Sequence, residues 1–348
     1  MILPAARLCY TVVTMDWINL LTAWYRKNAR DLPWRRTKDA YAIWVSEIML
    51  QQTRVAAVVP YYERFLTELP DVRALADVSD DRLHKLWEGL GYYSRAKNLK
   101  RAAAVVTETY GGKLPESYEA LLTLPGIGEY TAGAIASIAY GEPVPSVDGN
   151  VLRVYTRLFA VEKDVRDLSF RKQVRAALLP LMPGDDPGAF NAALMELGAV
   201  ICVPNGSPNC AACPIAAFCE AYRQGRTGEL PLTSKKRARR IEKKTVFALT
   251  LGGAPLGYRR PDTGLLAGLW QLPEAEGVLS DAQAAAWIGE RNLRPLGELR
   301  FYDRKHIFTH IEWHMRVCAA EVAAEELPEG WTRLDESHAL PTAYKICL

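Results

Sequence analysis

The 348-residue sequence lacks any uninterrupted apolar run of the roughly 20 residues that a membrane-spanning helix needs, because charges, glycine or proline break every candidate. It also lacks an internal repeat and, outside one basic segment, a low-complexity tract, so a repeat architecture is not expected. The formal net charge of +3 is too small to establish a nucleic-acid partner, because the charge of a whole chain does not show where the charges lie. These absences leave a globular protein of two or three domains, expected in the cytoplasm and without a membrane partner.

Cysteine is scarce outside one short stretch of the chain. Of seven cysteines, Cys9, Cys318 and Cys347 stand alone. The other four follow the pattern C-x7-C-x2-C-x5-C, as Cys202, Cys210, Cys213 and Cys219. Such crowding favours a metal site in a reducing compartment over a disulfide framework. Four thiolates suit either a zinc ion or a 4Fe-4S cluster, and the spacing alone leaves both open.

The first two-thirds of the chain read as helical. Across residues 16–224 apolar side chains recur three and four positions apart, for example in WVSEIMLQQTRVAAVVPYYERFLTEL (44–69). Proline and glycine separate the segments, and no strand alternation appears, so this part is predicted to be all-α. Residues 1–15 carry no clear targeting signal and are expected to be an unstructured extension, with Met15 an alternative start to Met1.

A second, smaller domain is expected after a basic linker. Residues 225–244 lose their apolar face and gather lysine and arginine, as an exposed linker does. Alternating β-branched and aromatic residues then predict strands, at 245–253, 264–274 and 306–322. One helix is predicted near residues 281–290. The last hundred residues therefore indicate an α+β domain.

A glycine turn before an alanine-rich helix is the first motif with a binding function. LPGIGEYTAGAI (124–135) places Gly126 and Gly128 in this turn. Glycines permit close approach of the backbone, and the unpaired N–H groups at the helix start can hold a phosphate. Taken alone, the same pattern fits a simple corner between two helices equally well.

Two carboxylates stand out as candidate catalytic groups. Glu47 lies on an otherwise apolar helix face, where a buried acid without a partner is costly, so a functional carboxyl with a raised pKa is favoured over a solvated charge. Asp148, in SVDGNVLRVYTRLF (146–159), stands at the start of another predicted helix. A structural N-cap is the ordinary explanation for an aspartate at that place.

Taken in order, the Glu47 helix, the glycine turn, VDGNV, the cysteine loop and FTH (308–310) resemble the MutY-type adenine DNA glycosylases of the endonuclease III superfamily. The resemblance covers nearly the whole chain from Asp16 onward. It implies a multidomain protein with an all-α helix-hairpin-helix glycosylase core, an iron-sulfur cluster loop and an α+β Nudix-like C-terminal domain.

The resemblance also implies how the chain divides. A six-helix domain with the helix-hairpin-helix would span residues 40–145. The iron-sulfur cluster domain would combine residues 16–39 with 146–224. After the linker, the Nudix-like 8-oxoguanine recognition domain would occupy residues 245–348.

The implied reaction is hydrolysis of the N-glycosidic bond of adenine mispaired with 8-oxoguanine or guanine. Glu47 would protonate the extruded adenine, and Asp148 would stabilise the oxocarbenium-like sugar. Tyr130 and Asn150 would support these two groups. Tyr130 stands where lyases of the superfamily carry a nucleophilic lysine, which predicts a monofunctional enzyme.

The partner implied is double-stranded DNA containing adenine opposite 8-oxoguanine, bound by a monomer. The residues expected to bind the DNA are Gln51, Gln52, Tyr92, Gly126 and Gly128. Tyr92, the first tyrosine of GLGYY, would intercalate beside the oxidised guanine. The residues expected to line the adenine pocket are Arg30, Trp34 and Arg35. Ala192 stands where relatives carry a polar side chain that touches the base.

Phe308, Thr309 and His310 match the Phe-Ser-His loop of the MutY recognition domain and would meet the 8-oxoguanine. The glutamate-rich helix of a Nudix hydrolase is missing from the sequence of this domain, so it is expected to bind a nucleotide without hydrolysing it. The resemblance makes the cysteine loop a 4Fe-4S site, although its first gap has seven residues where six are usual.

Two other functions remain open at this stage. A bifunctional endonuclease III-like glycosylase/lyase acting on oxidised pyrimidines is opposed by Tyr130 and by the C-terminal domain. A catalytically silent DNA-binding iron-sulfur protein is disfavoured because both Glu47 and Asp148 are present.

Overall fold

The computed structural model describes residues 4–234 and 238–348, so the first three residues of the expected extension and part of the expected linker lie outside it. Contacts between Cα atoms divide the chain into two units. One comprises Met1–Asp77 and Asn98–Lys235, and the other comprises Val78–Lys97 and Lys236–Leu348. Among the described residues, no helix is long and apolar enough to cross a membrane.

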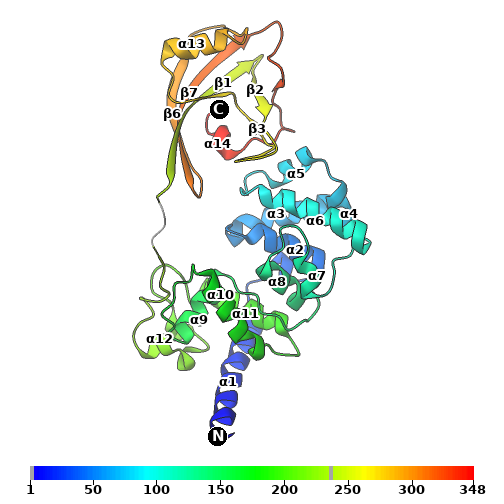
Figure 1. Cartoon of the computed structure of the whole chain (residues 1–348), viewed down its shortest axis with the longest axis vertical. Helices are drawn as coiled ribbons and strands as arrows, with labels where there is room; N and C mark the ends of the chain where they lie inside the picture. The colour runs from blue at the N-terminus through cyan, green and yellow to red at the C-terminus, as the bar shows by residue number, and fades with distance from the viewer. Residues whose placement is uncertain (1–3, 235–237) are drawn as a thin grey trace. The chain divides into compact units, whose positions relative to one another are not determined.

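The first unit is built from helices (Figure 1). Its α-helices are α1 (Pro4–Asn28), α2 (Ala40–Leu50), α3 (Val55–Glu68), α4 (Val72–Asp77), most of α6 (Ser94–Tyr110), α7 (Tyr118–Leu122), α8 (Glu129–Ala139), α9 (Gly149–Leu158), α10 (Leu168–Leu178), α11 (Pro187–Val200) and α12 (Glu220–Arg223). Its 3-10 turns are η1 (Pro33–Arg35), η2 (Leu179–Leu181), η3 (Cys210–Ala212) and η4 (Ala216–Phe218).

Helix α2 lies in the interior of this unit. Asp39 caps its start by accepting hydrogen bonds from the backbone N–H groups of Tyr41 and Ala42. Every residue from Tyr41 to Met49 is buried, and the helix packs against α3 and α8. An apolar sequence with no polar face forms such a helix, and Glu47 is carried into the interior with it.

A second core joins α1, α9, α10 and α11. Trp17 of α1 packs against Phe190 of α11, with ring centroids 5.8 Å apart, and Leu152 and Val174 complete the contact from α9 and α10. The cysteine loop packs on the same core through partly buried Cys213 and its neighbours. The helix that carries Asp148 at its start is therefore held by the same packing as the cysteine loop.

The second unit combines α5 (Asp80–Trp87) with a sheet domain. Figure 1 shows this sheet with the helices α13 (Asp281–Gly289) and α14 (Thr342–Lys345). Its strands are β1 (Arg240–Leu251), β2 (Ala254–Arg259), β3 (Trp270–Gln271), β4 (Glu274–Glu276), β5 (Arg294–Pro295), β6 (Arg300–Ile307), β7 (Ile311–Ala323) and β8 (Trp331–Arg333). The main strand order is β3-β2-β1-β7-β5, with β4, β6 and β8 pairing to β1, β7 and β2. Strands β1 and β7 are parallel, and the other pairs are antiparallel.

Two helices cover the two faces of this sheet. Helix α13 packs on Phe247 and Cys318, whereas α14 packs on Val246 and Val317. Adjacent residues of one strand point to opposite faces, so each helix has its own core. The α+β expectation and the helix near 281–290 agree with this arrangement.

Three expectations differ from the structure. Residues 4–15 are helical, not unstructured, because no glycine or proline interrupts the chain between Ala5 and Asn28 and α1 continues backwards to Pro4. The expected linker 225–244 ends earlier than predicted. Pairing of Arg240 with Ile311 draws residues 240–244 into β1, where backbone hydrogen bonding to β7 outweighs their polar composition.

The third difference concerns residues 78–97, which were expected within the helical domain and instead group with the sheet domain. Glu88 accepts a hydrogen bond from the backbone N–H of Leu340 and forms an ion pair with Lys345. Arg259 pairs with Asp81. These contacts join positions more than 150 residues apart, which helical periodicity cannot reveal.

We predict that the crossing of α8 and α11 tolerates no side chain at Gly188. A Cβ there would lie 2.8 Å from the Ile138 Cα and 2.9 Å from the Ser137 carbonyl oxygen. Gly188→Ala should therefore lower the free energy of unfolding by about 1–3 kcal/mol, the usual cost of overpacking, in a urea denaturation series. Gly184→Ala is the control, because a Cβ at that position meets no atom within 4 Å. Equal unfolding midpoints for the two variants would contradict the predicted close crossing.

Candidate active site

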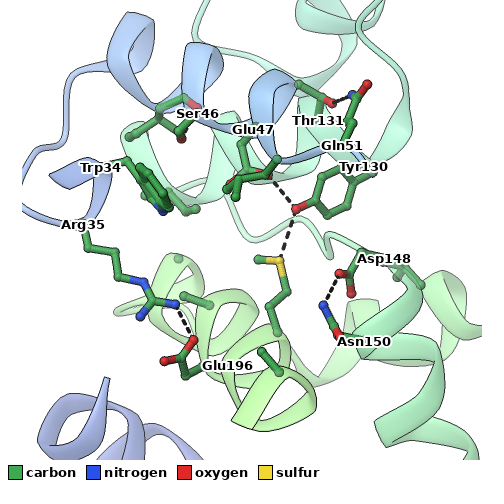
Figure 2. Close-up of a pocket in the computed structure, with 18 of the residues that line it drawn as sticks. Trp34, Arg35, Ser46, Glu47, Gln51, Tyr130, Thr131, Asp148, Asn150 and Glu196 are labelled. Carbon is green, nitrogen blue, oxygen red and sulfur yellow. Dashed lines mark hydrogen bonds and ion pairs between the residues drawn. The ribbon is translucent and has the colours of Figure 1, made fainter. Parts of the chain in front are cut away.

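A cavity of about 1030 Å³ lies among α2, α8, α9, α11 and the η1 turn (Figure 2). It gathers twelve of the residues that the sequence singled out, which come from separate parts of the chain. They are Arg30, Trp34, Arg35, Glu47, Gln51, Gln52, Gly126, Gly128, Tyr130, Asp148, Asn150 and Ala192. The two carboxylates therefore face one common space.

Glu47 is 6% exposed and has one neighbouring hydroxyl donor in Tyr130. The Tyr130 hydroxyl donates to Glu47 Oε2 over 2.5 Å, and its oxygen also lies 3.3 Å from the sulfur of Met195 (Figure 2). Burial raises the pKa of Glu47 to about 7, with a further increase from the charge of Asp148, while the Tyr130 hydrogen bond and Arg35 oppose the shift. Glu47 can therefore hold a proton near neutral pH and release it into the cavity.

Asp148 has different surroundings. Its side chain caps α9 by accepting from the Val151 backbone N–H over 2.7 Å, and its other oxygen accepts from Asn150 Nδ2, also over 2.7 Å. Burial raises the pKa of Asp148, but both hydrogen bonds and the charge of Arg153 favour the anion. The N-cap explanation is confirmed, and the capping carboxyl also lines the cavity.

Arg153 fixes the amide that supports Asp148. Its guanidinium donates to Asn150 Oδ1 and to the carbonyl oxygens of Gly198 and Cys202, each over 2.7 Å. With its Oδ1 held in this way, Asn150 must direct its Nδ2 toward Asp148.

A third carboxylate, Glu196, was missed by the sequence analysis. It is 1% exposed on α11, and its two oxygens accept from Arg30 N, Nε and Nη2 and from Arg35 Nη2, over 2.7 to 3.1 Å. Burial alone would raise the pKa of Glu196, but the hydrogen bonds from Arg30 and Arg35 lower it to about 2. The sequence did hold a signal, since FNAALMELG carries a lone acid on an apolar helix, as the Glu47 segment does.

The wall beside these charges is aromatic and apolar. Trp34 is buried and meets Tyr62 edge to face, with ring centroids 5.3 Å apart. Met195 and Ala192 line the cavity from α11. At position 192 the cavity therefore presents only a methyl group, as the sequence implied.

The glycine turn before α8 has the form expected of a hairpin. Gly126 has φ of +76°, and a Cβ there would lie 2.6 Å from the Asn98 Cβ, so only glycine fits. Gly128 is the N-cap of α8, with no atom within 4 Å of where a Cβ would stand. Among the described residues, no side chain caps the first N–H groups of this helix.

Gln51 and Gln52 follow the end of α2. Gln51 donates to the Thr131 hydroxyl over 3.4 Å (Figure 2), which links α2 to the hairpin helix α8. Gln52 has φ of 57°, a left-handed conformation that side chains other than glycine seldom adopt.

The remaining predicted DNA-facing residues lie in the second unit. Tyr92 is 42% exposed with φ of 49°, and its hydroxyl shares a 2.9 Å hydrogen bond with the Thr309 hydroxyl. Phe308, Thr309 and His310 form the turn between β6 and β7, where a continuous strand had been predicted. Phe308 packs edge-on against Trp313 at 4.8 Å, while Thr309 and His310 are exposed.

The four cysteines of the loop lie in the first unit around η3 and η4. Burial, together with the charges of Cys202, Cys219 and Cys210, raises the pKa of Cys213 to about 11, so the four sulfurs interact. Arg157 donates to the Cys202 sulfur over 3.2 Å. Within the described residues, no three potential ligands are arranged to hold a single metal ion.

Comparison with known families agrees with this architecture. Residues 45–180 match the HhH-GPD superfamily base excision DNA repair proteins, and residues 245–348 match the NUDIX domain. A solved thermostable thymine-DNA glycosylase is 29% identical and superimposes with a TM-score of 0.56, covering 62% of this chain and 99% of its own. A trapped endonuclease III–DNA complex, 21% identical with a TM-score of 0.53 over 64% of this chain and 99% of its own, has the same fold. Fold and cavity thus define a helix-hairpin-helix base-excision DNA repair protein.

Full-length relatives identify the family more closely. Adenine DNA glycosylases of Mus musculus and Homo sapiens are each 34% identical to this chain over 93% of its length. The matches cover 76% and 72% of those relatives. The chain belongs to the adenine DNA glycosylase family. This confirms the family and the fold class that the motifs indicated.

We predict that burial of Glu47 makes the protein less stable as pH rises. The folded state keeps the Glu47 proton up to about pH 7, whereas the unfolded chain releases it near its ordinary pKa of 4.5. Stability should therefore fall between these pH values, by about 3 kcal/mol in total. Glu47→Gln keeps the shape without the charge, so its melting temperature should exceed that of the parent at about pH 8.5 and approach it near pH 5.

Glu63→Gln is the matched control for this pH series, because Glu63 is exposed on α3. It should leave the melting temperature unchanged relative to the parent at both pH values. If the difference in melting temperature between Glu47→Gln and the parent does not grow with pH, Glu47 ionises in the folded protein at little cost in free energy, which would contradict the prediction.

Proposed function

We propose that this adenine DNA glycosylase excises adenine opposite 8-oxoguanine in double-stranded DNA, after the adenine has been turned out of the helix into the cavity of Glu47 and Asp148. One observation carries the proposal. Two carboxyl groups face the same cavity and burial raises the pKa of both, to about 7 for Glu47, but only Asp148 accepts hydrogen bonds from a helix N-terminus and an amide, which favour its anion. An acid and an anion on one site are what cleavage of a glycosidic bond requires.

Glu47 would act first. Adenine leaves as an anion unless a ring nitrogen gains a proton, so protonation by a neighbouring acid lowers the barrier. The Tyr130 hydroxyl bonds to one oxygen of Glu47, which leaves the other oxygen to carry the proton toward the base. After that transfer the Glu47 anion can orient a water molecule.

Asp148 would stabilise the positive charge that grows on the sugar as the bond breaks. Its orientation is fixed by the Val151 N–H and by Asn150, so no reorganisation is needed during the reaction. These donors also keep Asp148 ionised when the neighbouring Glu47 is protonated.

The base would lie between the Trp34 side and the arginine pair. The four donors from Arg30 and Arg35 occupy the acceptor sites of Glu196, so this carboxylate orients the arginines and has no acceptor left for adenine. Guanidinium edges, backbone groups or water then supply the polar contacts to the base. This distribution agrees with the apolar side chain of Ala192.

Binding of the DNA would involve both units. The N–H groups at the start of α8, which no side chain of the described residues caps, suit a phosphate of the strand that carries adenine. Tyr92 and the Thr309–His310 turn meet through a hydrogen bond, which supports a joint role in probing the 8-oxoguanine. A monomer suffices for this arrangement, because both carboxylates and the hairpin belong to one chain.

The cysteine loop would hold a 4Fe-4S cluster. A zinc ion keeps its sulfurs about 2.3 Å from the metal and therefore in one tight group. The cysteines of a 4Fe-4S cluster each bind a different iron and stand farther apart. The four partly buried cysteines of one short loop are a donor set that such a cluster takes. When bound, the cluster would supply the positive charge that keeps these thiolates ionised.

We further propose that the enzyme is monofunctional. Tyr130 occupies the position of the lyase lysine, and its hydroxyl is engaged with Glu47. Among the described residues, the lysine that lines the cavity is Lys38, which directly precedes Asp39, the N-cap of α2. The buried phenol of Tyr130 has no amine, so it cannot form a Schiff base with the sugar.

We predict that Glu47→Gln and Asp148→Asn each reduce single-turnover excision of adenine opposite 8-oxoguanine by at least about 100-fold, because each removes one half of the acid and anion pair. Binding to duplex carrying a non-cleavable adenine analogue should stay within about threefold, since phosphate contacts carry most of the affinity. Glu63→Gln serves as the control with parental activity. Excision by either variant at the parental rate would refute the proposed roles.

We predict that His310→Ala weakens the preference for 8-oxoguanine over guanine opposite adenine. His310 is exposed at the β6–β7 turn, where it can contact the base or its phosphate without supporting the fold. The ratio of single-turnover rates on the two duplexes should fall by about 10-fold, equal to the loss of one good hydrogen bond. His338→Ala, a histidine elsewhere in the same unit, should leave the ratio unchanged. A constant ratio in His310→Ala would exclude the recognition role.

A further inference from the structure

A buried amide, Asn191, lies beside the active site without facing the cavity. It is 1% exposed on α11, on the side of the helix that turns toward α8. Ala192, Met195 and Glu196 of the same helix line the cavity. An asparagine in a core requires partners for all its polar atoms, which makes its bonding informative.

Asn191 bonds three separate points. Its Oδ1 accepts from the backbone N–H of Ser146 over 3.0 Å, and its Nδ2 donates to the Val144 carbonyl oxygen and to the Ser137 hydroxyl, each over 2.8 Å. Because a backbone N–H can only donate and a carbonyl can only accept, the orientation of the amide is fixed. Asn191 thus joins α11, α8 and the extended loop of residues 142–147.

That loop connects the two catalytic elements. It begins after α8, whose Tyr130 holds Glu47, and it ends at Asp148. Ser146 is fully buried and its hydroxyl donates to the Tyr130 carbonyl oxygen over 2.9 Å. The loop is therefore bonded to α8 on one side and to Asn191 on the other, two residues before the catalytic aspartate.

Glycines bring these backbones close enough for one amide to span them. A Cβ at Gly133 of α8 would lie 2.8 Å from the Pro145 carbonyl oxygen. Gly188 allows the equivalent close approach of α11 to α8. The two bonds of Asn191 to Val144 and Ser146 then fasten the loop to α11.

We propose that Asn191 is a positioning residue for the glycosidase reaction, which sets the distance between Asp148 and the Glu47–Tyr130 pair by clamping residues 144–146 between α8 and α11. The proposal rests on the catalytic roles of Glu47 and Asp148 given above. Without the hydrogen bonds of Asn191 to Val144 and Ser146 the loop shifts. The Asp148 carboxylate then no longer faces the sugar when Glu47 faces the adenine. A misplacement of about 1 Å in such a pair lowers the rate by about 100-fold.

The test is single-turnover excision by Asn191→Leu, which keeps the volume and removes all three hydrogen bonds. We expect a rate about 100-fold below the parent, with affinity for the non-cleavable duplex within about threefold. Ser137→Ala is the matched control, because it removes the Asn191 contact to α8 but leaves both bonds to the loop. It should excise adenine at the parental rate.

A pH profile separates positioning from a general loss of stability. The groups acting on Glu47 are Tyr130, Asp148 and Arg35, and the Asp148 charge raises the pKa of Glu47. If the loop moves Asp148 away, the alkaline limb of the rate profile should shift to lower pH in Asn191→Leu. A lowered melting temperature with parental rate and parental limb would overturn the proposal. Equal slowing by Ser137→Ala would also overturn it.

Asn191→Asp is the second variant, for the case in which Asn191→Leu does not fold. This variant keeps an acceptor for the Ser146 N–H and loses the donor to Val144. We therefore expect it to excise adenine more slowly than Ser137→Ala but faster than Asn191→Leu. A parental rate in Asn191→Asp would count against the clamp. Failure of the underlying function is recognised separately, because Glu47→Gln would then excise adenine normally.

Discussion

The buried hydrogen bond between Tyr130 and Glu47 is the interaction on which the catalytic cavity depends. Helix α2 has no polar face, so its acid enters the interior and must find a partner there. The phenol is a neutral partner, which stabilises the carboxyl without neutralising it and leaves its pKa at about 7. An arginine in the same place would lower the pKa of Glu47, as Arg30 and Arg35 lower that of Glu196, and Glu47 could then not hold the proton that the proposed reaction requires.

Tyr130 must in turn be placed, and this explains the crowding of backbones around α8. The hairpin glycine Gly126 sets the start of the helix, while Gly133 and Gly188 let the catalytic loop and α11 approach it within van der Waals distance. Close packing of backbones leaves few alternative positions, so main-chain contacts and the buried Asn191 amide together limit the distance from Glu47 to Asp148. Rigidity of this kind provides the fixed electrostatic environment that transition-state stabilisation requires.

Sequence reasoning found the parts of the site that have a local signal. Glu47 stands alone in an apolar run, Gly126 in a turn before a helix, and the cysteines in one short loop. Glu196 has the same local pattern, yet its partners Arg30 and Arg35 lie 166 and 161 positions earlier, so only the folded chain reveals its role. For the same reason the grouping of residues 78–97 with the sheet domain, and the continuation of β1 through residues 240–244, could not be predicted.

Backbone strain supplies an independent argument about the DNA-facing residues. Gln52 and Tyr92 adopt left-handed conformations that cost a side chain about 1–2 kcal/mol and cost glycine almost nothing. Glycine at either position would therefore relieve the backbone strain. Gly91, next to Tyr92, takes this left-handed conformation. Strained side chains gather at binding sites, so these two conformations support the contacts with DNA that we propose. A tyrosine can stack on bases, and a glutamine can bond to their edges.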